Sequence, residues 1–436
     1  MMRWTVLLAV AGILAAAPGA LYKQSGFEAD ANGMAPGWRV WSPRAGTAPR
    51  AYVDASRGRE RPGSLVLSGS SNLAVCGGWE REVQGVAPRE WYRLTAHYRV
   101  EGPVYERSQV VARLDWRNAK GERVGQPDYA PGIERVGDWK RVTLDAPAPE
   151  GATNARVQLL LLYAPQATVW WDGIAVERIA APAPRRVTIA AVNFRPASGG
   201  TPESNVSGFI DAIGKSVSAG TDVILLSEII TSTATGRPYE AAGEPVPGPT
   251  TARLGEVARA RKAYIVAGLV EREGAAVYNA SVLIDRAGRL VGKYRKVYLP
   301  REEMEGGLTP GGDYPVFRTD FGTVGMMICW DLQFADPARA LALAGAEVIL
   351  MPIAGGSTVL DKARAIENRV FVASAGYSFP TRIVDPDGEI IAEAKERGTA
   401  AVATIDLARR YTNPWLGNMH DRFRKEVRLD ISTEPR

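Results

Sequence analysis

The sequence predicts two domains, of which the first is all-β and the second is α/β. Its 436 residues exceed the length of one ordinary domain. Short alternating runs separated by turns fill the first part, whereas apolar strand-like runs alternate with helical patterns in the second. The Pro/Ala segment 180–185 between them is expected to be a linker. We therefore expect a first domain over residues 21–179 and a second over residues 186–436.

The first domain is expected to be a β-sandwich, because short runs recur with Gly-, Pro- and Asn-rich turns between them. Eight of the eleven tryptophans lie here, and each has two interpretations. A position in the core is the commoner use in sandwiches, and a surface for stacking sugars is the alternative. The expected strands are Ser64–Ser68, Trp91–Val100, Val110–Asp115, Trp139–Leu144, Ala155–Tyr163 and Thr168–Glu177.

The second domain is expected to combine buried strands with helices that cover them. The segments Asp285–Gly288 and Asp385–Gly388 are typical of hairpin turns. The expected strands are Val187–Phe194, Asp222–Ser227, Ala263–Val270, Ala280–Ile284, Val324–Ile328, Glu347–Met351 and Val370–Ala375. The expected helices are Glu203–Ala219, Thr250–Lys262, Leu332–Ala344 and Val359–Asn368.

Residues 1–20 predict a secretory signal peptide. A positively charged start precedes an apolar run from Thr5 to Ala17, and small residues follow it. The run is too short for a stable membrane span. We expect cleavage near Gly19 or Ala20, a secreted or periplasmic protein, and no membrane span after cleavage; an uncleaved anchor is the alternative.

Composition excludes several classes of function. A net charge of +5 is small for this length, no run of five Lys or Arg occurs, and nucleic-acid motifs are missing, so no nucleic-acid partner is expected. The sequence also lacks the phosphate-binding glycine motifs of nucleotide enzymes. The only histidines, His97 and His420, are too few for a His/Cys zinc site, and structural roles are expected for both. We expect no metal and no cofactor.

Cys329 ends the apolar run Val324–Ile328, and Asp331 follows it. At a strand-to-helix turn the free backbone N–H groups favour a thiolate and can hold an oxyanion. Taken alone, the cysteine fits a buried core position better. A disulfide with Cys76 is not expected, because the two residues fall in different predicted domains.

A nucleophilic cysteine without a histidine needs another base, and two charged residues at apolar strand ends are candidates. Glu228 ends the run Asp222–Ser227, where a carboxylate is costly to bury unless it is paired. Its alternative role is a strand-end or helix-cap carboxylate. Lys296 lies in Lys293-Tyr-Arg-Lys296, and its alternative role is a solvated lysine in a basic loop.

Together these segments resemble the motifs of the nitrilase superfamily, or carbon–nitrogen hydrolases. Leu-Leu-Ser-Glu228 is similar to the family's glutamate box, and Tyr-Arg-Lys296-Val-Tyr-Leu-Pro to its lysine box. The segment from Gly325 to Phe334, which contains Cys329-Trp-Asp, is similar to its cysteine box. The resemblance covers about residues 186 to 425 and implies an αββα sandwich. More loosely, residues 26–38 and 169–176 resemble strands of galactose-binding-like jelly rolls and carbohydrate-binding modules, which implies a fold more than a ligand. Weak binding of a glycan and packing against the second domain are the two alternatives for the first domain.

The family resemblance also implies roles. Cys329 would be the nucleophile and Glu228 the general base, while Lys296 and the backbone N–H of Trp330 would stabilise the oxyanion. Family members often carry a second glutamate after the lysine box. Glu305 matches that place best here, and the neighbouring acidic residues Glu302 and Glu303 compete with it.

The resemblance leaves the reaction partly open. Cysteine is followed by Trp330-Asp331, where Asp is typical of amidases and Trp of nitrilases, so a small amide or N-carbamoyl substrate is expected. Nitrile hydrolysis and acyl transfer by the same residues are the alternatives. A glycan-binding protein with a vestigial hydrolase domain is the alternative from another class. The segment Asn413–Arg424 is similar to the tail through which family members form oligomers.

Overall fold

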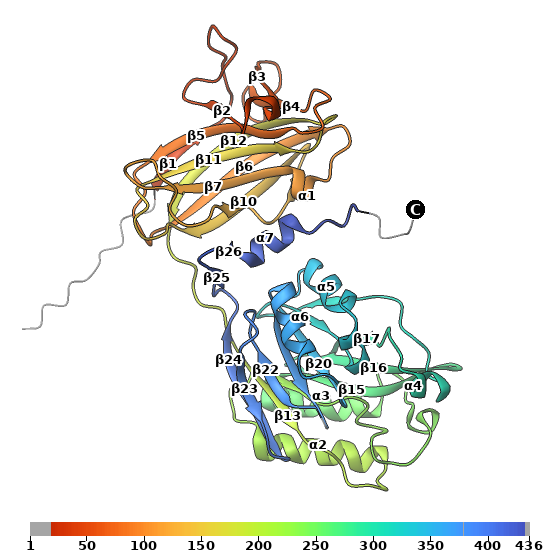
Figure 1. Ribbon diagram of the computed structural model, residues 1–436. Helices are drawn as coiled ribbons and strands as arrows, with labels where there is room; N and C mark the ends of the chain where they lie inside the picture. Colours follow the sequence, from red (N-terminus) through yellow and green to blue (C-terminus); the bar gives the residue numbers. More distant parts are fainter. Residues whose placement is uncertain (1–18, 378, 432–436) are drawn as a thin grey trace, which may run out of the picture. The chain divides into compact units, whose positions relative to one another are not determined.

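The computed structural model describes residues 19–377 and 379–431 (Figure 1). Its backbone contacts divide the chain into two units, of which unit 1 comprises Met1–Pro182 with Thr412–Arg436 and unit 2 comprises Ala183–Tyr411. The predicted signal peptide lies outside the described residues except for Gly19 and Ala20. Those two residues begin strand β1 (Gly19–Gln24).

Unit 1 consists mainly of two antiparallel sheets. One has seven strands in the order β3-β4-β12-β6-β10-β9, with β1 paired to β12, and the other has five strands in the order β2-β5-β11-β7-β8. All six strands predicted from the sequence are present, with ends that differ by three residues at most. The other strands are β2 (Arg39–Trp41), β3 (Arg50–Asp54), β4 (Ser64–Ser68), β5 (Cys76–Gln84), β6 (Trp91–Glu101), β7 (Val110–Arg117), β8 (Asp128–Tyr129), β9 (Glu134–Val136), β10 (Trp139–Pro147), β11 (Asn154–Leu162) and β12 (Thr168–Ile179).

The facing sides of these sheets share one hydrophobic core. Trp79, Trp116 and Trp171 are fully buried in it. The core interpretation of the tryptophans is confirmed for these three, and Trp38, Trp139 and Trp170 are buried as well. Aromatic rings of this size dominate the apolar area that such a core removes from water.

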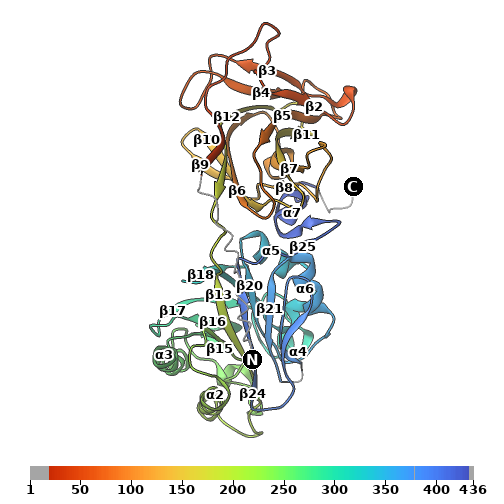
Figure 2. The same cartoon turned by 90° about the vertical axis from the view of Figure 1, so that its left-hand side faces the viewer.

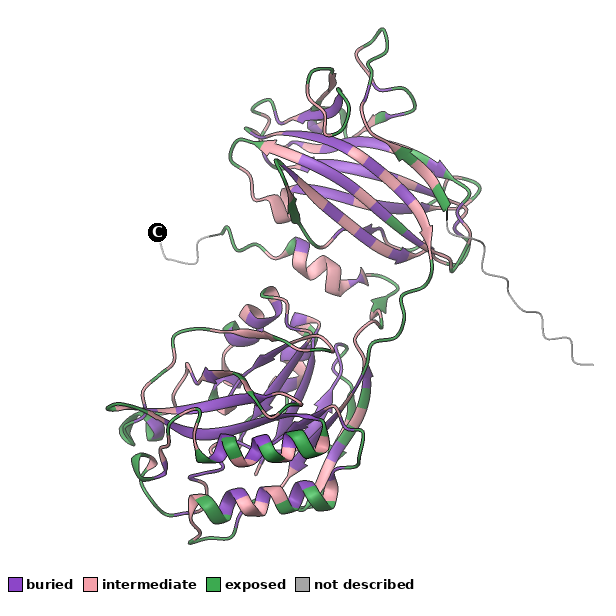
Figure 3. Ribbon diagram, turned by 180° about the vertical axis from the view of Figure 1, so that it is seen from behind, coloured by how far each residue is buried: buried purple, intermediate pink, exposed green. Residues whose placement is uncertain are grey.

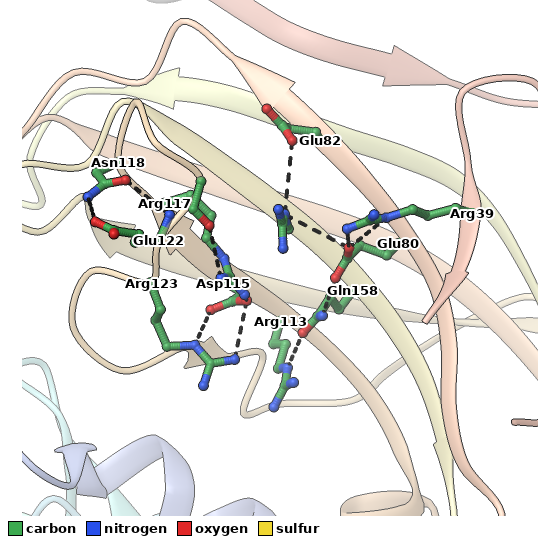
Figure 4. A network of polar contacts seen from close by, with 12 residues as sticks. Arg39, Glu80, Glu82, Arg113, Asp115, Arg117, Asn118, Glu122, Arg123 and Gln158 are labelled. Atoms are coloured by element: carbon green, nitrogen blue, oxygen red, sulfur yellow. Dashed lines mark hydrogen bonds and ion pairs between the residues drawn. The ribbon is translucent and has the colours of Figure 1, made fainter. Parts of the chain in front are cut away.

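The other side of the five-stranded sheet is polar (Figure 4). Glu80 and Asp115 are almost completely buried there, and both are paired with arginine. Glu80 accepts hydrogen bonds from Arg39 and Gln158, and Asp115 accepts one from Arg123 at 2.8 Å. This pairing offsets the desolvation of the two carboxylates. The alternation of apolar and polar sides is typical of an antiparallel sheet with one face on a core.

The C-terminal segment belongs to unit 1. Helix α7 (Met419–Glu426) contacts helix α1 (Glu106–Gln109) and strand β8. The segment also forms a small hairpin of β25 (Thr412–Asn413) and β26 (Gly417–Asn418). The predicted second domain extended to residue 436, whereas the structure ends unit 2 at Tyr411, because the tail packs on the first sheet pair.

Unit 2 is built around two six-stranded sheets, with orders β17-β16-β15-β14-β13-β24 and β18-β19-β20-β21-β22-β23. Apolar residues of both sheets form a common core. Strands β13, β14 and β15 are parallel neighbours, as are β19, β20 and β21. The strands are β13 (Arg186–Asn193), β14 (Val223–Leu225), β15 (Tyr264–Glu273), β16 (Ala276–Ile284), β17 (Leu290–Arg295), β18 (Val316–Arg318), β19 (Thr323–Met326), β20 (Val348–Pro352), β21 (Phe371–Ala375), β22 (Thr381–Val384), β23 (Ile390–Ala394) and β24 (Thr399–Asp406).

Helices cover the outer sides of both sheets (Figure 2). Helices α2 (Pro202–Ser216) and α3 (Pro249–Arg261) pack on the first sheet, and α5 (Asp336–Leu343) and α6 (Leu360–Asn368) pack on the second. Helix α2 begins with Thr201 as its cap, and its buried stripe includes Val206, Phe209 and Ile213. Figure 3 shows the opposite, exposed side of this helix in green.

The predicted hairpins and free cysteines are confirmed, whereas one predicted helix starts later in the chain. The predicted hairpins at residues 285–288 and 385–388 join β16 to β17 and β22 to β23. Cys76 and Cys329 are both free. The helix predicted from Leu332 begins instead at Asp336, after a short 3₁₀ turn over Cys329–Gln333. Among the described residues, none of the helices has both the length and the apolar character that crossing a membrane requires.

Candidate active site

The predicted site residues follow the ends of three strands of unit 2, two in the first sheet and one in the second. Glu228 follows β14, Lys296 follows β17, and Cys329 follows β19. A Cβ atom at Gly268 would lie only 2.7 Å from the Cα atom of Glu228. The glycine therefore allows the backbone that carries Glu228 to lie directly against β15.

The ammonium group of Lys296 binds two carboxylates. Its Nζ atom lies 2.8 Å from Oε1 of Glu228 and 2.6 Å from Oε1 of Glu303. Asn279, on β16, donates from Nδ2 to Glu228 Oε1 at 2.8 Å and contacts the Glu303 carboxylate at 3.3 Å. The amide and the ammonium thus hold both carboxylates in fixed places.

The lysine is fully buried, so the alternative of a solvated loop lysine is excluded. Burial by itself lowers the pKa of Lys296, but the negative charges of Glu228, Cys329 and Glu303 raise it far above its ordinary value. The side chain is therefore a permanent cation in the pH range where proteins function. Paired in this way, it meets the requirement that a buried charge be compensated.

The second glutamate of the cluster is Glu303, and the prediction of Glu305 is corrected. Glu303 is 6% exposed and points to Lys296, whereas the side chain of Glu305 is 62% exposed. Both lie on the short helix α4 (Arg301–Glu305), where residues two positions apart point in different directions. Burial raises the pKa of Glu303, Lys296 lowers it and Glu228 raises it, with a net upward shift.

Cys329 lies at the first position of the 3₁₀ turn, with a backbone φ of 41°. This left-handed conformation is unusual for a residue other than glycine and directs the side chain out of the strand line. Its Sγ atom lies 3.5 Å from the carbonyl oxygen of Gly355. Burial and the Glu228 carboxylate raise the pKa of Cys329 to about 12, while Lys296 opposes the shift.

Trp330 follows the cysteine and is 39% exposed. Its backbone N–H belongs to the first turn after a strand, where such groups have no partner within the turn.

The hydroxyl of Tyr377 donates to the backbone oxygen of Glu228 at 2.6 Å and so fixes the segment after β14. The structure thus brings Glu228, Lys296 and Cys329 into one electrostatic cluster.

Asn279 and Tyr377 were not identified from the sequence. Asn279 is fully buried within a strand of apolar residues, and its Oδ1 atom finds no hydrogen-bond partner among residues 19–377 and 379–431. A polar residue inside an apolar run is the signal that could have indicated it. Tyr377 follows β21 and carries no comparable signal. In the described part of the chain, no group of three His, Cys, Asp or Glu side chains is arranged as metal ligands.

Comparison with known proteins adds a family and its members. The sequence profile of the carbon–nitrogen hydrolase family matches residues 188–414, a little more than half of the chain. Human omega-amidase NIT2 is 28% identical over 229 residues, which are 47% of this chain and 83% of that protein. The omega-amidase NIT2 of Xenopus tropicalis is 30% identical over 214 residues, which are 43% and 78% of the two chains. A probable nitrilase of Schizosaccharomyces pombe is 33% identical over 211 residues, with 43% and 76% covered.

Solved structures of similar proteins include Nit3 of Saccharomyces cerevisiae, with a TM-score of 0.45 and 24% identity over 51% of this chain and 90% of that chain. An amidase from Nesterenkonia sp. gives a TM-score of 0.46 and 22% identity over 56% of this chain and 94% of that chain. The matched family region contains Glu228, Lys296, Glu303 and Cys329.

Proposed function

Because the chain belongs to the carbon–nitrogen hydrolase family, we propose that it is an exported enzyme that hydrolyses a small amide or N-carbamoyl compound. The products are a carboxylic acid and ammonia or an amine. The observation that carries the proposal is the buried cluster in which Lys296 binds Glu228 and Glu303 beside Cys329. Lys296 provides the cation, Glu228 the base and Cys329 the nucleophile that such a reaction needs.

In the first half of the reaction the Cys329 sulfur attacks the carbonyl carbon. Glu228 takes the thiol proton and delivers it to the leaving nitrogen as the carbon–nitrogen bond breaks. A thioester between substrate and Cys329 remains. In the second half Glu228 takes a proton from water, the hydroxide attacks the thioester, and the sulfur leaves with a proton.

The high pKa of Cys329 supports this division of roles. With a pKa of about 12, the resting thiol keeps its proton at neutral pH, so a base has to remove it as the attack occurs. Lys296 is cationic throughout and, with the Trp330 N–H, stabilises the negative charge that develops on the substrate oxygen. Glu303 and Asn279 hold Lys296 and Glu228 in place.

An amide is proposed in preference to a nitrile. The acidic residue Asp331 follows Trp330, and two of the relatives reported above are named omega-amidases. Nitrile hydrolysis and transfer of the acyl group to an amine use the same three residues, so product analysis is what separates the three reactions.

The finer architecture belongs to the same proposal. We propose a four-layer αββα sandwich for unit 2, with helix pairs outside two facing sheets. For unit 1 we propose a jelly-roll-like accessory domain, supported by its two antiparallel sheets around one core.

The proposal predicts that Cys329→Ala abolishes ammonia release from a panel of small amides, N-carbamoyl compounds and nitriles. Glu228→Gln lowers turnover by at least about a hundredfold, because the amide cannot accept the thiol proton. Export is tested separately. The protein is produced in cells that secrete it, and the mass of the secreted chain is expected to show that residues 1–20 have been removed.

Cys76→Ala is the matched control, because this free cysteine lies in unit 1. It is expected to leave ammonia release unchanged. Full turnover in Cys329→Ala would contradict the proposed reaction.

A further inference from the structure

Asp331 is completely buried two residues after the nucleophile, and none of the proposed reaction steps uses it. Its carboxylate accepts three hydrogen bonds from two separate segments of unit 2. A buried carboxylate is costly, so this placement calls for a reason.

One oxygen of Asp331 fixes the turn that carries Cys329. Oδ2 accepts from the backbone N–H of Ile328 at 2.9 Å, directly before the cysteine. The backbone N–H of Asp331 donates to the Ile328 oxygen at 3.0 Å. These two bonds close the turn in which Cys329 adopts its left-handed conformation.

The same carboxylate binds the segment that carries Lys296. Oδ1 accepts from the backbone N–H of Tyr298 at 3.0 Å, and Oδ2 accepts from the hydroxyl of Tyr294 at 2.7 Å. That hydroxyl in turn accepts from the backbone N–H of Val297 at 3.3 Å. Lys296 is thus enclosed on both sides by residues that Asp331 holds.

We propose that Asp331 is a positioning residue that joins the Cys329 turn to the Lys296 segment and sets the distance between nucleophile and cation. The inference rests on the proposed function, since it assigns a purpose to that distance. Asp331 does not touch the reacting atoms and acts only through the two segments that it binds.

Asp331→Asn tests the inference with almost no change in volume. The asparagine has one acceptor oxygen, so its NH₂ group must face the donor of either Ile328 or Tyr298, and one of the two links is lost. We expect kcat for a small aliphatic amide to fall by about a hundredfold with KM unchanged, as for a misplaced catalytic group. Tyr294→Phe keeps both backbone links, and a smaller fall is expected.

Alkylation of Cys329 by iodoacetamide, measured against pH in a Cys76→Ala background, gives a readout that needs no substrate. Loss of the link moves Lys296 away from the thiol, so the pKa of Cys329 rises and the alkylation profile moves to higher pH. Removal of a negative charge without any movement would shift the profile to lower pH. The direction therefore separates positioning from a simple charge effect.

Glu271→Gln is the matched control. This carboxylate is also almost fully buried in unit 2 and is paired with Lys293 and Arg295, outside the proposed machinery. We expect its alkylation profile and kcat to equal those of the parent. Thermal unfolding of all variants confirms that they are folded.

The inference is overturned if folded Asp331→Asn keeps its kcat, or if its alkylation profile stays in place or moves to lower pH. If the parent enzyme releases no ammonia from any substrate, the proposed function fails by itself. The alkylation profiles still decide the role of Asp331 in that case.

Discussion

Glu303 and Glu305 are separated by one residue, yet only Glu303 can act on Lys296. Glu303→Gln is expected to lower kcat by about a hundredfold, because a neutral amide cannot balance the ammonium charge or keep its proton in place. Glu305→Gln is expected to leave kcat unchanged, since its side chain is 62% exposed and its ion-pair partner is Arg301 at 4.0 Å.

Initial rates of ammonia release at saturating amide measure both effects. The two variants share the same chemical change on one short helix, so each serves as control for the other. An equal fall in both would mean that helix α4 as a whole, and not the carboxylate of Glu303, matters.

Single residues of the site were predictable to different degrees. Cys329 and Glu228 each follow an apolar run that is visible in the sequence, whereas Lys296 follows the mixed strand β17 and was identified by the resemblance to the family's lysine box. The choice between Glu303 and Glu305 depends on where α4 starts, because the start determines which side chain faces the cluster. Asn279 was not identified from the sequence, because its role comes from a contact with Glu228, which lies 51 positions away in the chain.

Helix α7 contains a buried lysine, Lys425. Lys425 is 2% exposed, and its Nζ atom finds no hydrogen-bond partner in the described part of the chain. Burial and the nearby Arg107 lower the pKa of Lys425 from 10.5 to about 8. Because the folded state binds this proton less tightly than the unfolded state, unit 1 is about 3 kcal/mol more stable above pH 10.5 than below pH 8, and this part of its stability is lost as the pH falls between the two values.

Lys425→Met is therefore expected to stabilise unit 1 by about 3 kcal/mol at neutral pH, and the difference is expected to vanish towards high pH. Urea unfolding of both proteins across this range, followed by circular dichroism, measures it. Lys120→Met, at an exposed lysine of the same unit, should show no such dependence on pH. A constant difference between Lys425→Met and the parent would rule out the buried proton equilibrium.

Regular strands and helices were easier to predict than short ones. The long apolar runs gave β13, β15 and β20 nearly in full, since a buried strand must be apolar on both sides. The helix predicted from Leu332 starts late, because Pro337 fits the first turn of a helix and fixes the start at Asp336. Short edge strands such as β8 and β18 have too few residues to show a pattern.

The boundary between the two units at the linker could be predicted from the sequence, whereas the return of the chain to unit 1 could not. The Pro/Ala composition marks the linker 180–185, where the structure shows neither helix nor strand. The return to unit 1 at Thr412 has no such composition. The family resemblance assigned the tail to the second domain, whereas packing against α1 and β8 decides its place.

The chain passes from unit 1 to unit 2 after Pro182 and returns to unit 1 at Thr412. These two connections predict how the protein responds to a cut in the linker. Cleavage between residues 180 and 185, at an introduced protease site, should give two bands on a denaturing gel. The halves should still elute together in gel filtration, because the segment after Tyr411 remains joined to unit 2 while its helix α7 packs on α1 and β8 of unit 1. Removal of the chain after Tyr411 takes this link away and should weaken the co-elution. Separation with the tail intact would contradict its packing in unit 1.

The return of the tail also has a consequence for synthesis on the ribosome. Residues up to Pro182 emerge first, and domains generally begin to fold as they emerge. Unit 1 nevertheless lacks the helix that covers α1 until all of unit 2 has been translated. Unit 2 can thus finish folding while unit 1, which was synthesised earlier, still lacks helix α7. Unit 1 is completed only when the C-terminal segment leaves the ribosome and α7 packs on α1 and β8.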